Sequence, residues 1–330
     1  MKKKGIFTIS LIVVLIIGIS FFIYKVFNFK DNNQSVVKST TVSAENNKNT
    51  HIFMCADDGN AMPTCTTIAS VLSNSLKDEK VSIHIVSFED NHMSKENIRK
   101  IESLKTTIKD FNLDFTYFDK RRLDEFYTDY WNKAIMVKLY PAELFPDLDR
   151  IIWLDDDVIV RESLSDIYNM DMNGKYMAGV EVISECKIYR DTPKFPRWIT
   201  AGIGVYNLKE FRKNNVQQML IDSAKDCKAD TAPDRYGASD EWALTFGIPE
   251  DKMILLPYKY SVMCAAFGKD AWPDLKVEDC AILHYASNFC KPWKNSEQIN
   301  KKFLDEWIKY YKLTEYAKEK GKSANIKKAA

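Results

Sequence analysis

Three consecutive carboxylates, Asp155, Asp156 and Asp157, stand in mid-chain between two apolar runs, residues 151–154 and 158–160. A buried strand that ends in three carboxylates is costly unless another group pairs with them. Because strand side chains alternate, we expect Asp155 and Asp157 to point one way and Asp156 the other. Hard oxygen ligands at a strand tip suit Mg²⁺ or Mn²⁺ that also holds phosphate oxygens. The alternative is a solvated acidic turn, which the strongly apolar flanks disfavour.

The composition describes a globular protein without a strong charge bias. The chain has 330 residues, of which 45% are hydrophobic and 28% charged, enough for one large or two modest domains. The formal net charge is +1, so no overall attraction to nucleic acid is implied. Neither GxGxxG nor GxxxxGK occurs, so a dinucleotide site or a P-loop is unsupported.

The N-terminus predicts a membrane anchor. Residues 6–24 are mostly apolar and follow three lysines, and about twenty such residues span a bilayer. A cleaved signal peptide has a shorter apolar core with small residues after it, whereas lysine and aromatic residues follow here. We therefore expect an uncleaved signal-anchor in residues 1–30 and a flexible stem in residues 31–50. The lysines favour a cytoplasmic N-terminus and an extracytoplasmic main domain, in the Golgi lumen if the host is eukaryotic.

The cysteines leave two alternatives open. There are seven, an odd number, and no CxxC motif, so neither a zinc knuckle nor a dithiol motif is suggested. An extracytoplasmic domain could carry disulfides that the sequence does not assign. Equally, most of the cysteines could be small buried apolar residues.

Strands and helices are expected to alternate through the first half of the chain. The expected strands are residues 51–56, 81–86, 115–118 and 150–154, and the expected helices are residues 62–75, 95–109 and 131–144. This order predicts an α/β fold with a mostly parallel sheet covered on both faces. Ligands of such sheets bind at the carboxyl ends of the strands, where the acidic turns 57–58 and 155–157 both fall.

The second half is less regular. Strands are expected at residues 175–181, 200–206 and 282–285, and helices at residues 208–222, from residue 240, and at 300–316. The glycines of the first two strands indicate close backbone approach. We expect a main domain over residues 51–300 and a C-terminal helix with a basic tail over residues 301–330.

Together these residues resemble glycosyltransferase family 8, whose members are retaining enzymes of the GT-A fold. The segments that carry the resemblance occur in the family's order: Ala56-Asp57-Asp58, Lys138-Leu139, Trp153 to Val160 with the DxD motif, Gly179-Val180-Glu181, Ala201-Gly202-Ile203, and His284-Tyr285 with Lys291-Pro292-Trp293. A DxD motif alone is weak evidence. Its combination with the distant His-Tyr and Lys-Pro-Trp segments is specific.

The resemblance implies a Rossmann-like, mostly parallel sheet flanked by helices and a hexosyltransferase that uses a UDP-sugar of the glucose or galactose class. The acceptor would be a glycan, lipid or protein. Asp155, Asp157 and His284 would bind Mn²⁺, with Mg²⁺ as the alternative, and the ion would neutralise the departing diphosphate. The alternative for His284 is a buried structural histidine.

Further residues acquire donor-binding roles from the resemblance. Ala56, Asp57 and Asp58 would form the turn that binds uracil or ribose. Lys291 and Lys138 would bring positive charge to the phosphates, or Lys138 would bridge Asp156 to the donor; the alternative for Lys138 is a solvated helix lysine. The remaining expected donor- or acceptor-side residues are Glu181, Ala201, Gly202 and Ser287.

Several positions depart from the family pattern. Residues 59–61 lack the aromatic residue that stacks on the base, and Ser287 replaces a glycine in a loop that is one residue longer. The family's Asp-Gln-Asp reads Asp240-Glu241-Trp242. We expect Asp240 and Glu241 to be catalytic, with Glu241 either a nucleophile or a hydrogen-bond partner of the sugar.

Two rival functions remain. Phosphatases of the haloacid dehalogenase type also end a strand in DxD, but they place it near the start of the domain. A non-catalytic binder of sugar nucleotides or glycans would keep the fold. Release of UDP from a UDP-sugar separates both from a transferase.

Overall fold

The computed structural model describes residues 49–128, 132–181, 198–228, 239–264, 275–286 and 291–319. All of them belong to one compact unit, residues 46–330. The predicted anchor in residues 1–30 and most of the predicted stem lie outside these ranges. Among the described residues, no helix is both long and apolar enough to cross a membrane.

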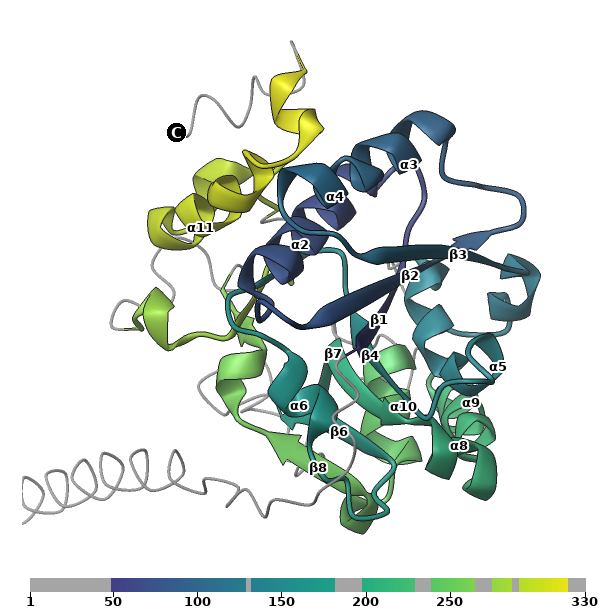
Figure 1. Ribbon diagram of the computed structural model, residues 1–330. Helices are drawn as coiled ribbons and strands as arrows, with labels where there is room; N and C mark the ends of the chain where they lie inside the picture. The colour runs from purple at the N-terminus through teal and green to yellow at the C-terminus, as the bar shows by residue number, and fades with distance from the viewer. Residues whose placement is uncertain are drawn as a thin grey trace, which may run out of the picture. The chain divides into compact units, whose positions relative to one another are not determined.

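A seven-stranded sheet forms the centre of this unit (Figure 1). Its order is β3-β2-β1-β4-β7-β6-β8, and every neighbouring pair is parallel except the two pairs that β7 makes. The strands are β1 (Asn49–Cys55), β2 (Lys80–Phe88), β3 (Asn112–Phe118), β4 (Arg150–Leu154), β6 (Met177–Glu181), β7 (Ile199–Asn207) and β8 (Met253–Leu256). The mostly parallel sheet expected from the sequence is confirmed.

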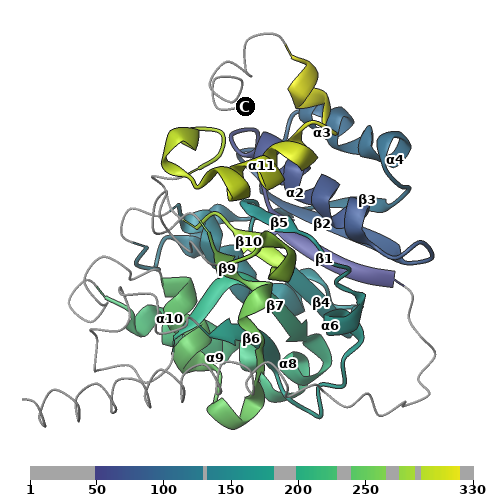
Figure 2. The same cartoon turned by 90° about the vertical axis from the view of Figure 1, so that its left-hand side faces the viewer.

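Helices cover both faces of the sheet, as Figures 1 and 2 show. Alternate residues of β1 enter different cores: Ile52 packs in the core that contains residues of α2, α3 and α11, and Phe53 in the core that contains residues of α8, α9 and α10. The helices are α2 (Ala61–Asn74), α3 (Lys95–Glu102), α4 (Leu104–Thr107), α5 (Pro141–Leu144), α6 (Ser165–Asn169), α8 (Leu208–Asn214), α9 (Val216–Asp226), α10 (Ser239–Gly247) and α11 (Lys301–Tyr311).

A small second sheet brings distant parts of the sequence together. Its order is β5 (Val158–Val160), β10 (Ile282–His284) and β9 (Val262–Met263). β10 runs antiparallel to β5 and pairs His284 with Val158. Because β5 directly follows the acidic triplet, this register places His284 beside Asp157.

Three expected helices differ from the structure. The helix expected at 95–109 breaks at Ser103, and that at 208–222 breaks at Asn215, whose φ is 53°. The segment expected at 131–144 is, in its described part, the 3₁₀ helix η2 (Lys133–Leu139) followed by α5, which Pro141 opens. Proline fits the first turn of a helix, where its missing N–H leaves no bond unmade.

Candidate active site

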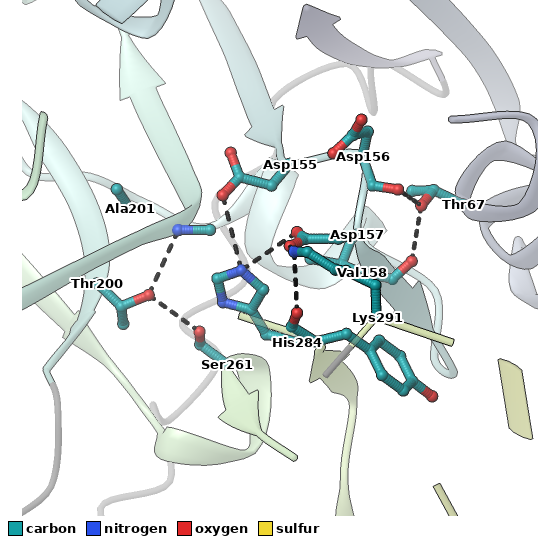
Figure 3. Close-up of polar contacts among 12 residues, drawn as sticks. Thr67, Asp155, Asp156, Asp157, Val158, Thr200, Ala201, Ser261, His284 and Lys291 are labelled. Atoms are coloured by element: carbon teal, nitrogen blue, oxygen red, sulfur yellow. Dashed lines mark hydrogen bonds and ion pairs between the residues drawn. The ribbon is translucent and has the colours of Figure 1, made fainter. Parts of the chain in front are cut away.

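Asp155, Asp157 and His284 converge at the carboxyl end of β4 (Figure 3). His284 Nε2 lies 3.6 Å from Asp155 Oδ2 and 3.3 Å from Asp157 Oδ1. Burial would lower the pKa of His284, but the carboxylates of Asp157 and Asp155 raise it. The two aspartates point the same way, as strand alternation predicted.

A glycine lets the imidazole reach this position. A Cβ atom at Gly202 would lie 2.5 Å from His284 Nδ1, so only glycine leaves room for the ring. Gly202 also accepts a hydrogen bond from the backbone N–H of Asp155 through its carbonyl, at 3.0 Å. The strand β7 therefore supports both the acidic turn and the histidine, and the close approach expected at its glycines is confirmed.

The three side chains form a candidate site for one divalent ion, because their ligand atoms all lie within 4.8 Å of one another. Ligand atoms around an ion with bonds of about 2.1 Å stand about 3 Å apart, close to the spacing of His284 Nε2 and Asp157 Oδ1. Asp157 Oδ1 is buried and, apart from the ion-pair contact with His284, has no hydrogen-bond partner among the described residues. A buried carboxylate oxygen with so little compensation is costly, and an ion at this point would satisfy it. The structure thus contains a candidate metal site built from the three expected residues.

Lys291 neutralises the acidic cluster from the other side. Its Nζ donates to Asp157 Oδ2 and, at 3.0 Å, to the carbonyl of Tyr285. Burial disfavours the ionised form of Asp157, but Lys291 and His284 outweigh it and hold the pKa of Asp157 below its ordinary value. Lys291 thus places a positive charge beside the candidate metal ligands.

Lys138 is buried rather than solvated. Its Nζ donates to Asp240 Oδ2 at 2.7 Å, to the Ala201 carbonyl at 3.0 Å and to Asp155 Oδ1 at 3.2 Å. Burial alone would lower the pKa of Lys138, but Asp155 and Asp240 raise it, so the lysine stays charged. It also lies over the ring of Trp153, 4.9 Å from the centroid. This network joins the metal site to helix α10.

Asp156 faces away from the metal ligands and binds a residue that the sequence analysis did not assign. Asn60 Nδ2 donates to Asp156 Oδ2 at 2.5 Å, while Asn60 Oδ1 accepts from the backbone N–H of Asp57 at 2.7 Å. Burial and the charge of Asp157 raise the pKa of Asp156 to about 7. Asn60 therefore links the two acidic turns, although it occupies the region where an aromatic residue was expected.

The first acidic turn is held by its own neighbours. Asp57 accepts from Gly59 N–H and from Asn91, each at 2.7 Å, and Asp58 Oδ1 accepts from Ser94 N–H at 2.7 Å and Asn97 at 2.8 Å.

Beside this turn lies a pocket of about 260 Å³, whose lining includes Cys55, Ala56, Asp57, Asn60, Phe88 and Asn132. Phe88, at the end of β2, gives this pocket an aromatic wall. Nothing in the sequence spacing marked Phe88 for this place, because its position depends on how β2 pairs with β1.

Glu241 and Asp240 open α10 next to Lys138. Glu241 Oε2 accepts from the indole N–H of Trp198 at 2.6 Å. Burial and neighbouring Asp240 raise the pKa of Glu241 to about 7. Asp240 Oδ1 is buried without a partner among the described residues. Glu181 ends β6 opposite Ile199, and Ser287 lies outside the described residues.

The comparisons with known proteins agree with this geometry. The sequence matches the model of glycosyl transferase family 8 over residues 51–297. The chain belongs to this family. The membership confirms the expected enzyme class for the matched domain, a retaining glycosyltransferase, and leaves the phosphatase alternative unsupported.

The relatives differ in how much of them the chain covers. Probable galacturonosyltransferase 10 of Arabidopsis thaliana is 23% identical over 309 residues, covering 80% of this chain and 56% of the relative. Probable galacturonosyltransferase 13 of the same plant is 25% identical, covering 48% of this chain and 32% of the relative. General stress protein A of Bacillus subtilis is 22% identical, covering 81% of this chain and 94% of the relative. The chain thus spans less than two thirds of these plant relatives.

Solved structures share the fold. The bifunctional glycosyltransferase WbbM in its apo form has a TM-score of 0.64 at 17% identity, covering 87% of this chain and 53% of WbbM. The galactosyltransferase LgtC, in complex with donor and acceptor sugar analogues, has a TM-score of 0.61 at 18% identity, covering 79% of this chain and 95% of LgtC. These similarities confirm the GT-A type of fold that was expected from the sequence.

Proposed function

We propose that this family 8 domain transfers a hexosyl group from a UDP-sugar to a glycan, lipid or protein acceptor with the help of Mn²⁺. The observation that carries the proposal is the convergence of Asp155, Asp157 and His284, with Lys291 beside them. One imidazole and two carboxylates favour Mn²⁺ over Mg²⁺, which prefers oxygen ligands. A bound ion would stabilise the charge that develops on the departing diphosphate.

The chain's own residues divide the remaining work. Lys291, positioned by Asp157, supplies a second positive charge for the diphosphate. Asp240 is fixed by Lys138, and its Oδ1, which has no partner in the described part of the chain, can accept a hydrogen bond from a sugar hydroxyl. The pocket beside Asp57 would take the uracil and ribose, with Phe88 packing against the base and Asp156 near the ribose.

Glu241 keeps two candidate roles. As a nucleophile it would attack the anomeric carbon as UDP leaves, and the acceptor oxygen would then displace it, so that the configuration is retained. Otherwise it accepts a hydrogen bond from the sugar, and the acceptor attacks from the face that UDP leaves. Its contact with Trp198 positions the carboxylate for either role.

The test is release of UDP from UDP-glucose, UDP-galactose and UDP-galacturonate by the full chain, with Mn²⁺ and with EDTA. We expect release with at least one donor, loss of release in EDTA, and loss of release in Asp157→Asn. A protein that binds UDP-sugars in the presence of Mn²⁺ but never releases UDP would be a binder, which would overturn the proposal.

The apolar stretch in residues 6–24 supports a second proposal, that the chain is a single-pass membrane protein with its catalytic domain outside the cytoplasm. Protease treatment of intact and permeabilised cells tests it. If the protease cleaves the domain only when it can reach the cytoplasmic face of the membrane, this orientation is wrong.

A further inference from the structure

Trp153 lies two residues before Asp155, and because strand side chains alternate, the two share one side of β4. The indole N–H of Trp153 donates to Asp155 Oδ1 at 2.7 Å. The tryptophan is 3% exposed, and its ring packs edge to face on Phe53, its neighbour on β1, with the centroids 4.8 Å apart. A buried indole N–H needs an acceptor. Here the acceptor is a candidate metal ligand.

The two oxygens of Asp155 have different surroundings. Oδ1 accepts from Trp153 at 2.7 Å and from Lys138 at 3.2 Å. Oδ2 lies 3.6 Å from His284 Nε2, on the side where the ligand atoms converge (Figure 3). Asp157 is divided in the same way, since its Oδ2 accepts from a lysine and its Oδ1 lies 3.3 Å from His284 Nε2. Each carboxylate therefore turns one oxygen toward an ion, while protein donors hold the other.

The indole N–H is the part of Trp153 that core packing does not require. Lys138 Nζ lies over the indole ring, 4.9 Å from its centroid. Because the face of an aromatic ring is negative and its edge positive, the ammonium group on the face and the carboxylate at the edge are both favourable. A phenylalanine ring would offer the same face to Lys138 and to Phe53, but it has no N–H for Asp155.

We propose that Trp153 is a positioning residue that holds Asp155 as a one-oxygen ligand and so favours Mn²⁺ over Ca²⁺; this rests on the metal-dependent function proposed above. Ca²⁺ takes about six to eight oxygen ligands and often binds both oxygens of one carboxylate. Mn²⁺ is typical of sites with about six ligands. A second bond from Asp155 to Ca²⁺ would cost the hydrogen bond from the indole, whereas Mn²⁺ needs Oδ2 alone.

The experiment compares Trp153→Phe with wild type in the full chain. Electron paramagnetic resonance measures the Kd of Mn²⁺, and displacement of Mn²⁺ by Ca²⁺ measures the selectivity. We expect the variant to bind Mn²⁺ about tenfold more weakly, the usual effect of losing a residue that orients a metal ligand. Ca²⁺ should then displace Mn²⁺ at a lower ratio of Ca²⁺ to Mn²⁺ than in wild type. The control is Trp307→Phe, the same change in a buried tryptophan of the other core, which should alter neither value.

The outcomes separate this proposal from the transferase function. An unchanged Kd of Mn²⁺ in Trp153→Phe would overturn the positioning role, and so would displacement by Ca²⁺ that is no easier than in wild type, because a variant that only packs badly binds both ions more weakly. If Trp153→Phe does not fold, naphthylalanine at this position keeps a two-ring side chain without the N–H and gives the same test. Failure of wild type to bind Mn²⁺ would count against the proposed function itself.

Discussion

Lys138 shows how strongly the site depends on single charges. It is buried, and its ammonium group is shared between Asp155, Asp240 and the Ala201 carbonyl. Removing one partner from such a network leaves an uncompensated buried charge, which costs about 3–5 kcal/mol. The sequence left open whether this lysine is solvated, because a helical pattern alone does not tell which face of a short helix meets the sheet.

Gly202→Ala is expected to weaken metal binding. The new Cβ would stand 2.5 Å from His284 Nδ1, so the imidazole must leave its place between the aspartates. Misplaced ligands or their supports typically cost about ten- to a hundredfold in metal affinity. Titration with Mn²⁺, followed by calorimetry or electron paramagnetic resonance, measures the change.

Gly204→Ala is the matched control on the same strand. Its Cβ would meet the far end of the flexible Met177 side chain and lie 3.1 Å from Tyr206, away from His284. We expect this variant to lose stability but to keep its affinity for Mn²⁺. Equal Mn²⁺ affinity in Gly202→Ala and wild type would show that His284 does not act as a ligand.

Glu241→Gln separates the two roles of the carboxylate through pH. Because the pKa of Glu241 is about 7, the wild-type group is neutral below and ionised above this value. For a hydrogen-bonding role we expect the variant to keep turnover within about tenfold of wild type. The inflection near pH 7 in the wild-type plot of turnover against pH should be flattened in the variant. A collapse of turnover together with a trapped glycosyl ester on wild-type Glu241 would instead identify a nucleophile.

The same substitution has a predicted effect on stability. The folded state raises the pKa of Glu241 above its ordinary 4.5, so it holds this proton more tightly than the unfolded state. The resulting stabilisation is complete below about pH 4.5 and is lost as pH rises through about 7. We therefore expect the Tm of Glu241→Gln relative to wild type to increase between pH 5 and pH 8. Asp156 titrates in the same pH range in both proteins, so its contribution to the Tm difference cancels.

At the scale of elements, helix α2 holds the acidic turn in shape. The Thr67 hydroxyl lies 2.9 Å from the carbonyl of Asp156 and 2.7 Å from that of Val158. Both contacts are drawn as dashed lines in Figure 3. Further along the same helix, Ser70 accepts from the Val160 N–H at 2.9 Å. These contacts connect α2 to the turn that carries both carboxylate ligands.

Thr67→Val is expected to weaken Mn²⁺ binding several-fold, because the carbonyls of Asp156 and Val158 lose the single hydroxyl donor that they share, at a cost of about 1–3 kcal/mol. Thr67→Ser should restore the affinity. Thr66→Val is the control, since the buried Thr66 hydroxyl bonds only to the Met62 carbonyl of its own helix among the contacts described. If both valine variants lose stability but bind Mn²⁺ equally well, Thr67 supports the fold and not the site.

The sequence predicted the strands of the first half well, because the apolar runs around Ile52, Ile83 and Ile152 are buried on both sides of the sheet. It also predicted Asp155 and Asp157 on one side, which strand alternation determines. The pairing of β10 with β5, which positions His284, depends on chain segments far apart in sequence. Local patterns do not encode such a register, and here only the resemblance to a family connected them.

The sequence could not predict the contacts of Asn60 and Trp198 for the same reason. Asn60 meets Asp156, and Trp198 meets Glu241, across long sequence separations. The segment around Met136 was misjudged as a regular helix because its apolar spacing fits both a 3₁₀ and an α-helix over so short a run.

At the scale of the whole folded unit, the C-terminal segment shares the core of the main domain. Trp307 and Tyr310 of α11 are buried in the same cluster as Ile52 and Ile68. After α11, the 3₁₀ helix η7 (Glu315–Lys318) lies against α3, where Lys100 pairs with Glu319. The last described residues, up to Glu319, thus reach the layer that supports the first acidic turn.

Tyr316 makes this connection specific. Its hydroxyl donates to Asn97 Oδ1 at 2.7 Å, and Asn97 Nδ2 donates to Asp58 Oδ1 at 2.8 Å. Because the hydrogen bond from Tyr316 orients the Asn97 amide, its loss allows the amide to turn away from Asp58. A hydrogen bond of this kind contributes about 0.5–1.5 kcal/mol, which corresponds to a several-fold change in an equilibrium constant.

We therefore expect Tyr316→Phe to raise the KM for the UDP-sugar several-fold while kcat changes little, because in the proposed function the first acidic turn binds the donor and does not supply metal ligands. Tyr310→Phe is the matched control, because Tyr310 is another buried tyrosine of the C-terminal segment. Its hydroxyl accepts a hydrogen bond from Asn74 at 2.9 Å, which is not part of the first acidic turn. Donor titrations of UDP release with both variants measure the difference. An equal KM in both would mean that the C-terminal segment stabilises the domain without ordering the donor site.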